Sequence, residues 1–271
     1  MQPRSRFWAD LSTRDFAQLD AARTVAVLPV GATEQHGPHL PLAVDQLLVD
    51  GIVQASLPHI PADVPVLFLP TQAVGYSPEH TDFPGTLSLS SSLVAGTWIE
   101  LGACVAKAGV KKLLIFNSHG GQVSLLDIAA RELRMKARML VYGCSWWNLP
   151  LAEANAQFSA DEHRFGVHAG EVETSMILAL KPQAVDMQHA ANFHSTSRDR
   201  AAKYAVLGDG KSAKMGWAMQ DYNPQGAAGN AAAATADKGR KLVDAAGLQL
   251  ALLLQELSAL PLSTLADPPA G

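Results

Sequence analysis

Cysteine is almost missing from this sequence: of 271 residues, only Cys104 and Cys144 carry thiols. They lie far apart in the chain, and each has apolar neighbours. We therefore expect two buried free thiols in a reducing cytoplasm. A framework of several disulfide bonds, as in small secreted domains, is excluded by the count alone.

Long apolar runs are also missing. No uninterrupted apolar stretch reaches the roughly 20 residues needed to cross a bilayer. The first residues, MQPRSRFWADLSTRDF, contain a basic cluster that no apolar region follows, which argues against a secretory signal peptide. We expect a cytoplasmic protein without a membrane partner.

The chain also has no large excess of charge of either sign. The formal net charge is −4, and 17% of the residues are charged against 48% hydrophobic. This balance gives no reason to expect nucleic acid or an anionic membrane as a partner. The length suits one large α/β domain or two small ones. Because neither an internal repeat nor a clear linker interrupts the chain, we expect a single domain over 1–271, with a frayed tail from about residue 261.

What the sequence does contain is an alternation of short apolar runs and segments of helical period. Runs rich in Val, Leu and Ile, without the polar alternation of a half-exposed strand, predict buried parallel strands at 24–30, 64–70, 111–117 and 138–145. Periodicity and terminal signals predict helices at 45–57, 90–109, 122–137, 170–182 and 228–260, the last broken or bent near Gly239 and Gly247. This order predicts an α/β fold with a mostly parallel sheet covered on both faces.

Between the last two predicted helices, residues 186–230 are rich in Gly, Asn, Asp and Ser. We interpret them as a long excursion with short elements of its own. Irregular chain of this length in a compact domain is usually functional or part of an interface.

Acids and imidazoles gather where predicted strands give way to helices, and function in such sheets lies at the carboxyl ends of the strands. The candidates are Glu34, His36, Asp45, His119, His168, Glu171 and Glu173. Carboxylates and imidazoles without soft sulfur are the ligands that Zn²⁺, Mn²⁺ or Fe²⁺ accept.

Each candidate also has an ordinary interpretation. Glu34 and His36 could be a solvated loop pair, His119 could cap the next helix, and His168 or Glu173 could be satisfied polar groups of the core. His39, between two prolines, could serve packing only. The conjunction of these residues, with glycines and prolines that fix the backbone beside them, favours a metal site.

Four segments resemble the creatininase (creatinine amidohydrolase) family, in the order in which the family has them. They are LPVGATEQHGPHLPLAVDQ at 28–46, GYSPEHTDFPGTLSLS at 75–90, FNSHGGQ at 116–122 and HAGEVETSMILALKP at 168–182. The resemblance spans roughly residues 24–182. It implies a three-layer α/β/α sandwich, a centre of two divalent metal ions, hydrolysis of a non-peptide or unusual C–N amide bond, and a homohexamer.

The resemblance also implies roles for residues of the metal centre. Glu34 and His119 match ligands of one metal, His36 matches a ligand of the other, and Asp45 matches the carboxylate that bridges them. Creatininase has its last ligand, a glutamate, at the position of Gly121 here.

Two residues of this chain could replace that glutamate. Glu171 fits the HAGExETS pattern of other branches of the family, so we expect it to be the fifth ligand. Gln122 is the alternative, although it offers only a neutral carbonyl oxygen.

Catalytic and substrate-binding residues follow from the same resemblance. His168 matches a histidine that handles protons, and Glu173 could orient it. Trp147 matches an aromatic residue that packs on the substrate. His80 is either a substrate contact or a structural histidine of a proline-containing loop.

The positions at which this chain differs from creatininase bear on the choice of substrate. Val167 and Gly120 stand where creatininase has polar residues, which argues against creatinine. We expect a metal-dependent amidohydrolase that acts on a small-molecule amide. The alternatives are another hydrolase or decarboxylase chemistry on the same scaffold, such as a lactonase, and a non-catalytic binding protein that retains metal. The ligand types suit Zn, Mn and Fe alike.

Overall fold

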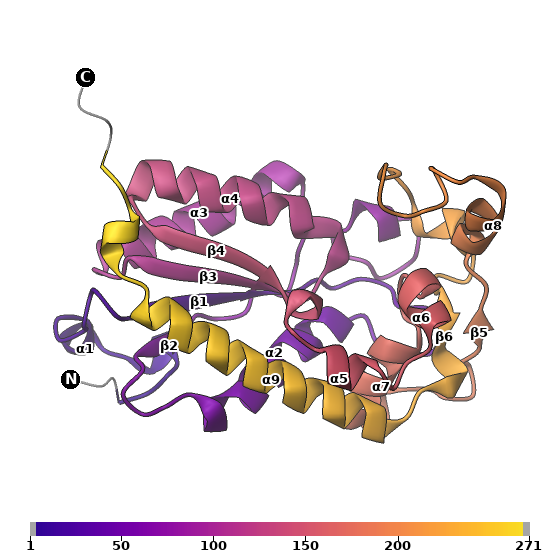
Figure 1. Ribbon diagram of the computed structural model, residues 1–271, viewed down its shortest axis with the longest axis horizontal. Coiled ribbons are helices and arrows are strands. Elements are labelled where there is room, and N and C mark those ends of the chain that lie inside the picture. Colours follow the sequence, from indigo (N-terminus) through magenta and orange to yellow (C-terminus); the bar gives the residue numbers. More distant parts are fainter. Residues whose placement is uncertain (1–3, 268–271) are drawn as a thin grey trace.

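A four-stranded parallel sheet forms the centre of the computed structural model, which describes residues 4–267 (Figure 1). The strands are β1 (Val25–Val30), β2 (Val66–Phe68), β3 (Lys112–Asn117) and β4 (Leu140–Ser145). Their order is β2-β1-β3-β4, and each neighbouring pair is parallel. The two central strands therefore end at the same edge of the sheet.

Helices cover both faces of this sheet (Figure 1). One face carries α3 (Ser91–Lys107) and α4 (Val123–Ala137), and the other carries α2 (Val44–Ser56), α7 (Glu171–Leu180) and α9 (Ala236–Ala259). Alternate residues of a strand face opposite sides, so Leu28 packs with α3 and α4 whereas Val27 packs with α2 and α9. The three-layer α/β/α fold expected from the sequence is confirmed.

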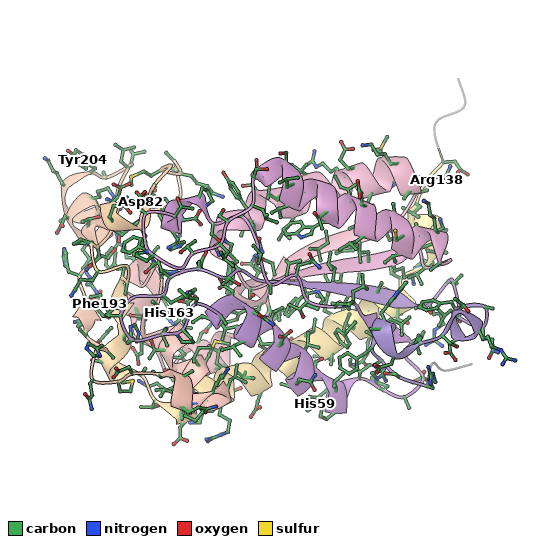
Figure 2. All side chains as sticks on the ribbon, turned by 180° about the vertical axis from the view of Figure 1, so that it is seen from behind. His59, Asp82, Arg138, His163, Phe193 and Tyr204 are labelled. Atoms are coloured by element: carbon green, nitrogen blue, oxygen red, sulfur yellow. The ribbon has the colours of Figure 1, made fainter. Side chains whose placement is uncertain are left out.

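Shorter elements complete the chain. They are α1 (Thr13–Phe16), α5 (Ala152–Asn155), α6 (Ala160–Phe165), β5 (Asn192–Phe193), α8 (Thr196–Lys203) and β6 (Gly229–Asn230). β5 and β6 form a small antiparallel pair apart from the central sheet. The predicted excursion over 186–230 thus contains short elements, as expected. Phe193 and Tyr204 of this segment lie with Asp82 at one end of the molecule, away from Arg138 (Figure 2).

The predicted break in the last helix is wrong, because α9 runs without interruption over Ala236–Ala259. Gly239 and Gly247 of α9 instead allow neighbouring helices to approach closely. A Cβ at Gly239 would overlap the carbonyl oxygen of Ser175, and one at Gly247 would lie 2.6 Å from Ala55 Cβ. α9 is long and apolar enough to cross a membrane by length and composition, but half of its most apolar stretch is buried inside the protein. Its place against α2 and α7 makes it a core helix of this fold.

Two smaller expectations need correction. Cys104 is exposed and Cys144 is only partly buried, so the thiols are not both in the core. Burial raises the pKa of the Cys144 thiol to about 11. The strand predicted at 138–145 is not buried on both faces, because β4 is an edge strand and Tyr142 on it is 44% exposed. In the expected frayed tail, Leu262–Thr264 form a 3-10 turn, and residues 268–271 lie outside the described part of the chain.

Candidate metal centre and active site

Four candidate ligands from the sequence meet at the carboxyl edge of the sheet. The loop after β1 carries Glu34 and His36, the chain beyond β3 carries His119, and Asp45 lies in the first turn of α2. Each of these side chains belongs to a residue that is at most 2% exposed. Parallel strands that end at one edge bring these distant chain positions together.

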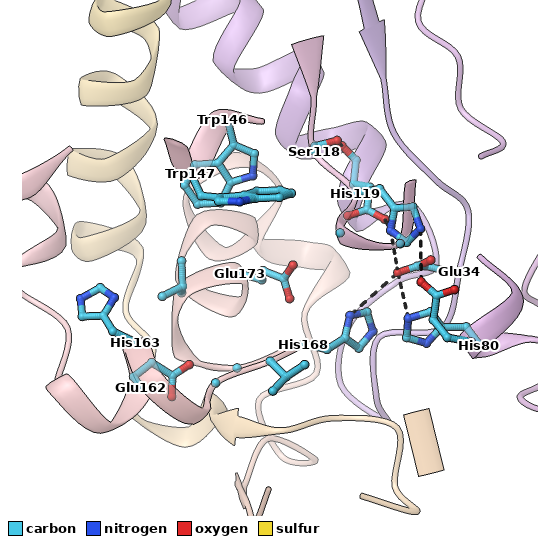
Figure 3. A pocket seen from close by; sticks show the side chains of 18 of the residues that line it. Glu34, His80, Ser118, His119, Trp146, Trp147, Glu162, His163, His168 and Glu173 are labelled. Carbon is cyan, nitrogen blue, oxygen red and sulfur yellow. Dashed lines mark hydrogen bonds and ion pairs between the residues drawn. The ribbon is translucent and has the colours of Figure 1, made fainter. Parts of the chain in front are cut away.

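Glu34 lies at the centre of the cluster (Figure 3). Its Oε1 is 3.3 Å from His80 Nε2, 3.3 Å from His119 Nδ1 and 3.9 Å from His168 Nδ1. Although burial opposes the shift, His119 above all, with His80 and His168, holds the pKa of Glu34 well below its usual range. This carboxylate is therefore ionised.

Asp45 faces two imidazoles with its two oxygens. Oδ1 lies 3.9 Å from His36 Nε2, and Oδ2 lies 3.5 Å from His119 Nδ1. Burial and then the neighbouring Glu34 raise the pKa of Asp45 well above its usual range. Two buried carboxylates this close repel each other unless positive charge lies between them. Asp45 thus has the placement that a bridging ligand needs.

Hydrogen bonds fix which ring nitrogen of His36 and His119 faces the carboxylates. His36 Nδ1 donates to the backbone carbonyl of Glu34 at 3.0 Å, so Nε2 is turned toward Asp45. His119 Nε2 donates to the backbone carbonyl of Tyr76 at 2.9 Å, so Nδ1 is turned toward Glu34 and Asp45. A histidine that binds metal usually donates its other N–H in this way.

The raised pKa of His119 indicates that the cluster needs a positive charge. Burial alone would lower the pKa of His119, but Glu34, and then Asp45, raise it to about 10. In the metal-free protein a proton on this ring therefore supplies the positive charge. A cation bound between the same groups would replace that proton.

Gln35 sets the proton positions on the two remaining histidines. Its side-chain oxygen accepts the N–H of Gly37 at 3.0 Å, so its amide nitrogen donates to His80 Nδ1 at 2.7 Å. His80 then directs its Nε2–H at Glu34. The backbone carbonyl of Gln35 accepts from His168 Nε2 at 2.7 Å, which leaves His168 Nδ1 facing the cluster as an acceptor.

The structure does not bring the fifth candidate ligand, Glu171, to the cluster. The carboxylate of Glu171 forms an ion pair with Lys238, away from the cluster. Glu173 instead offers an oxygen that lies, with ligand atoms of His36 and Asp45, in a group all within 4.8 Å of one another. Residues two apart on a helix point in nearly opposite directions, so both glutamates cannot face one site. The structure therefore brings Glu173 to the cluster and not Glu171.

A tight turn before α7 holds Glu173. Ala169 is fully buried with φ of +53°, in the left-handed region that costs a residue with a Cβ about 1–2 kcal/mol. Its N–H donates to the carboxylate of Glu173. The same turn places His168, so the strained residue serves both side chains.

Glu162 is a buried carboxylate that the sequence interpretation missed. It is 4% exposed, and its oxygens accept the N–H of Glu171 at 2.6 Å and that of Asn230 at 2.8 Å. Gly170 and Gly229 make room for it, since a Cβ at either position would collide with Glu162 Oε1. A carboxylate at the start of α7 is favoured by the helix dipole, which gives Glu162 a structural role.

The cluster opens into a pocket of about 410 Å³. Trp147, the predicted aromatic wall, lines it and is 37% exposed (Figure 3). Trp217, from the excursion over 186–230, also lines it and was missed in the sequence. Its ring meets that of His80 edge-on at 6.0 Å between centroids. Among the described residues, those that line the pocket include neither Lys nor Arg.

The residues present fit a pair of divalent metal ions. Within residues 4–267, Glu34 Oε2, His36 Nε2 and Asp45 Oδ2 are buried without a hydrogen-bond partner. Ligand atoms of Glu34, Asp45 and His119 lie within 4.8 Å of one another, as do those of His36, Asp45 and Glu173. The two groups share Asp45, and their oxygen and nitrogen donors suit Zn²⁺, Mn²⁺ or Fe²⁺.

Comparison with known proteins agrees with this geometry. Residues 9–254 match the family model described as creatininase, creatinine amidohydrolase. The chain belongs to the creatininase family. The mycofactocin precursor peptide peptidase of Mycolicibacterium smegmatis is 32% identical to it over 181 residues, which are 66% of this chain and 67% of that protein. The creatinine amidohydrolase of Pseudomonas putida is 31% identical over 204 residues, 70% of this chain and 77% of that protein.

A solved creatininase structure, named for manganese, has a TM-score of 0.73 to this chain at 26% identity. The match covers 93% of this chain and 98% of that chain. The protein is thus a creatininase-family amidohydrolase with the fold of that structure. The two relatives are named for different substrates, a precursor peptide and creatinine, so similarity to them does not by itself select the substrate.

Proposed function

We propose that this protein is a metal-dependent amidohydrolase that cleaves the C–N bond of a small amide. The observation that carries the proposal is the placement of Asp45, whose two oxygens face His36 and His119 at the base of a pocket. A metal site that serves only structure is closed by protein ligands, whereas this cluster borders a cavity.

Two divalent ions are the cofactor that we propose. Glu34, Asp45 and His119 would hold one ion, and His36, Asp45 and Glu173 would hold the other. Such ions supply Lewis acidity to the substrate carbonyl and lower the pKa of water toward neutrality.

The protein's own groups handle the proton and the substrate. His168 Nδ1 faces the cluster with its lone pair, so it can take a proton from the attacking water and return it to the leaving nitrogen. His80, which directs Nε2–H at Glu34, orients that carboxylate. Trp147 and Trp217 would flank a flat substrate and exclude water from it.

The charges of the pocket favour neutral or cationic substrates. Its lining contains five carboxylates, those of Glu34, Asp45, Glu79, Glu162 and Glu173. Two divalent ions would offset four of the five negative charges, and the lining residues in the described part of the chain supply no Lys or Arg to hold an anion. An amide with a free carboxylate would therefore lack a partner for its charge.

Reconstitution tests the proposal. The protein is stripped with a chelator, loaded with Zn²⁺, Mn²⁺ or Fe²⁺, and assayed on matched small amides and lactones. We expect amide hydrolysis that needs metal, and loss of at least about 100-fold in kcat for His168→Gln at unchanged metal content. Hydrolysis of lactones alone would favour the lactonase alternative, and tight metal binding without hydrolysis would favour a binding protein.

A charge series tests the substrate class. Amides that differ only in a neutral, amino or carboxylate substituent are compared on the same enzyme. Val167 lines the pocket and is 38% exposed, so Val167→Lys adds a positive charge there, with Val167→Gln as its matched control. We expect Val167→Lys alone to raise kcat/KM for the carboxylate substrate. A wild-type preference for the carboxylate substrate contradicts the proposed class.

We also propose a cytoplasmic homo-oligomer, the hexamer that the resemblance implies. Large apolar side chains on α3 and α4 are exposed, among them Leu93 at 59% and Met135 at 76%. Light scattering on the purified protein measures the assembly directly, and a monomer at micromolar concentration contradicts it.

A further inference from the structure

Glu79 is a buried acid whose function the metal ligands named above do not explain. It lies in the short 3-10 turn Pro78–His80 and is 9% exposed. Its Oε1 is buried without a hydrogen-bond partner in the part of the chain that the structure describes. An ionised oxygen in such a place is costly unless an interaction retains it.

The position of Glu79 depends on Gly121. A Cβ built on Gly121 would overlap Glu79 Oε1 and would lie 2.6 Å from His119 Nε2. At the neighbouring Gly120, the same Cβ would meet open space, with nothing from residues 4–267 within 4 Å. The missing side chain at position 121 is thus what lets the carboxylate of Glu79 reach its place.

The carboxylate lies beside His119 and also borders the cluster, since ligand atoms of Glu79, Glu34 and His80 lie within 4.8 Å of one another. His119 Nε2 is 2.9 Å from the Tyr76 carbonyl, 3.2 Å from Ser77 Oγ and 3.6 Å from Glu79 Oε1. All three oxygens come from one short segment, and His119 Nδ1 points away from them toward Glu34. An acceptor and a negative charge behind a metal-binding imidazole fix its orientation and strengthen its other nitrogen as a ligand.

We propose that Glu79 is a positioning residue of the metal centre. In the space left by Gly121, its negative charge lies 3.6 Å from His119 Nε2, whose N–H donates to the Tyr76 carbonyl. The charge favours the ring orientation that directs Nδ1 at the ion shared with Glu34 and Asp45. This inference rests on the proposed function, since it assigns a further residue to the same centre. Groups that support a ligand in this way typically contribute 10- to 100-fold to metal affinity.

The test compares three single variants of the full-length protein. Glu79→Gln removes the charge and keeps the shape. Gly121→Ala displaces the carboxylate with one methyl group, and Gly120→Ala adds the same methyl group to open space as the matched control. Zn²⁺ stoichiometry is measured by elemental analysis, and Zn²⁺ affinity by competition with a chelator. Circular dichroism melting confirms that each variant is folded.

We expect Glu79→Gln and Gly121→Ala each to weaken the binding of one Zn²⁺ by about 10- to 100-fold. The second ion and the Gly120→Ala variant should stay within about threefold of the wild type. The loss in Gly121→Ala has a second cause, because its Cβ would also lie 2.6 Å from His119 Nε2, so Glu79→Gln is the decisive variant.

Two results would overturn the inference. Wild-type affinity in Glu79→Gln means that the carboxylate does not support His119. Complete loss of one ion in Glu79→Gln makes Glu79 a direct ligand instead. A wild-type protein that binds no divalent ion contradicts the proposed function as well, which separates that failure from these.

Discussion

The exchange of Glu171 for Glu173 as the fifth ligand can be decided by two isosteric substitutions. Glu173→Gln should remove the ion held with His36 and Asp45, because a neutral amide replaces an anionic oxygen of that group. Glu171→Gln should keep both ions, because its carboxylate pairs with Lys238 and not with the cluster. The two variants remove the same charge from the same helix, so each is the control for the other.

Glu171→Gln should instead lower stability. The Glu171 side chain is 6% exposed and that of Lys238 is 28% exposed, so the pair is largely desolvated and the lysine loses its charged partner. A buried charge-assisted pair that loses one member costs up to about 3–5 kcal/mol, and the partial exposure of Lys238 lowers this to about 1–3 kcal/mol. At about 2–4 °C per kcal/mol, the expected fall in Tm is roughly 2–12 °C.

Elemental analysis and thermal melting of the metal-loaded proteins measure both effects. Lys238→Met in the wild-type and Glu171→Gln backgrounds completes a double-mutant cycle, in which we expect a coupling of about 1–3 kcal/mol. Loss of an ion in Glu171→Gln, together with full occupancy in Glu173→Gln, would refute the reasoning and restore the expectation from the sequence.

Three further outcomes are expected. Asp45→Ala should lose both ions and all activity, because both groups of ligands share this carboxylate; two tightly bound ions by elemental analysis would contradict it. Creatinine should be hydrolysed at least about 100-fold more slowly than by a true creatininase, since Val167 and Gly120 offer its ring no hydrogen bond; comparable turnover would show otherwise. The metal-free protein should lose stability as the pH rises from about 6.5 to about 10, because Glu34 stabilises the charged form of His119 only in the folded state and raises its pKa to about 10. Urea unfolding across this range measures the loss, and bound Zn²⁺ should abolish it.

Much of the fold follows from local pattern. β1 and β3 begin and end within one residue of the apolar runs that predict them, because a strand buried on both faces has a continuous apolar sequence. The break predicted in α9 fails for a non-local reason. Gly239 and Gly247 weaken a helix by themselves, but here they let α9 approach α7 and α2 closely, and that contact is invisible in the helix's own sequence.

In the candidate site, too, some residues follow from local sequence and others depend on distant contacts. Glu34, His36, Asp45 and His119 follow from strand ends and a specific motif. The choice between Glu171 and Glu173 depends on the rotation of α7 and on Lys238, 67 residues away in sequence. Neither fact is local, so the sequence alone could not show which of the two glutamates faces the cluster.

Trp217 and the candidate metal ligands lie on different parts of the fold. The candidate metal ligands project from the ends of the central strands and α2 and from the first turn of α7, whereas Trp217 lies outside the central sheet, on the segment between the two-residue strands β5 and β6. Replacing Trp217 alters the wall that a substrate meets and changes none of the candidate metal ligands. Substrate range can therefore diverge between descendants of one ancestor while the hydrolytic chemistry is inherited unchanged.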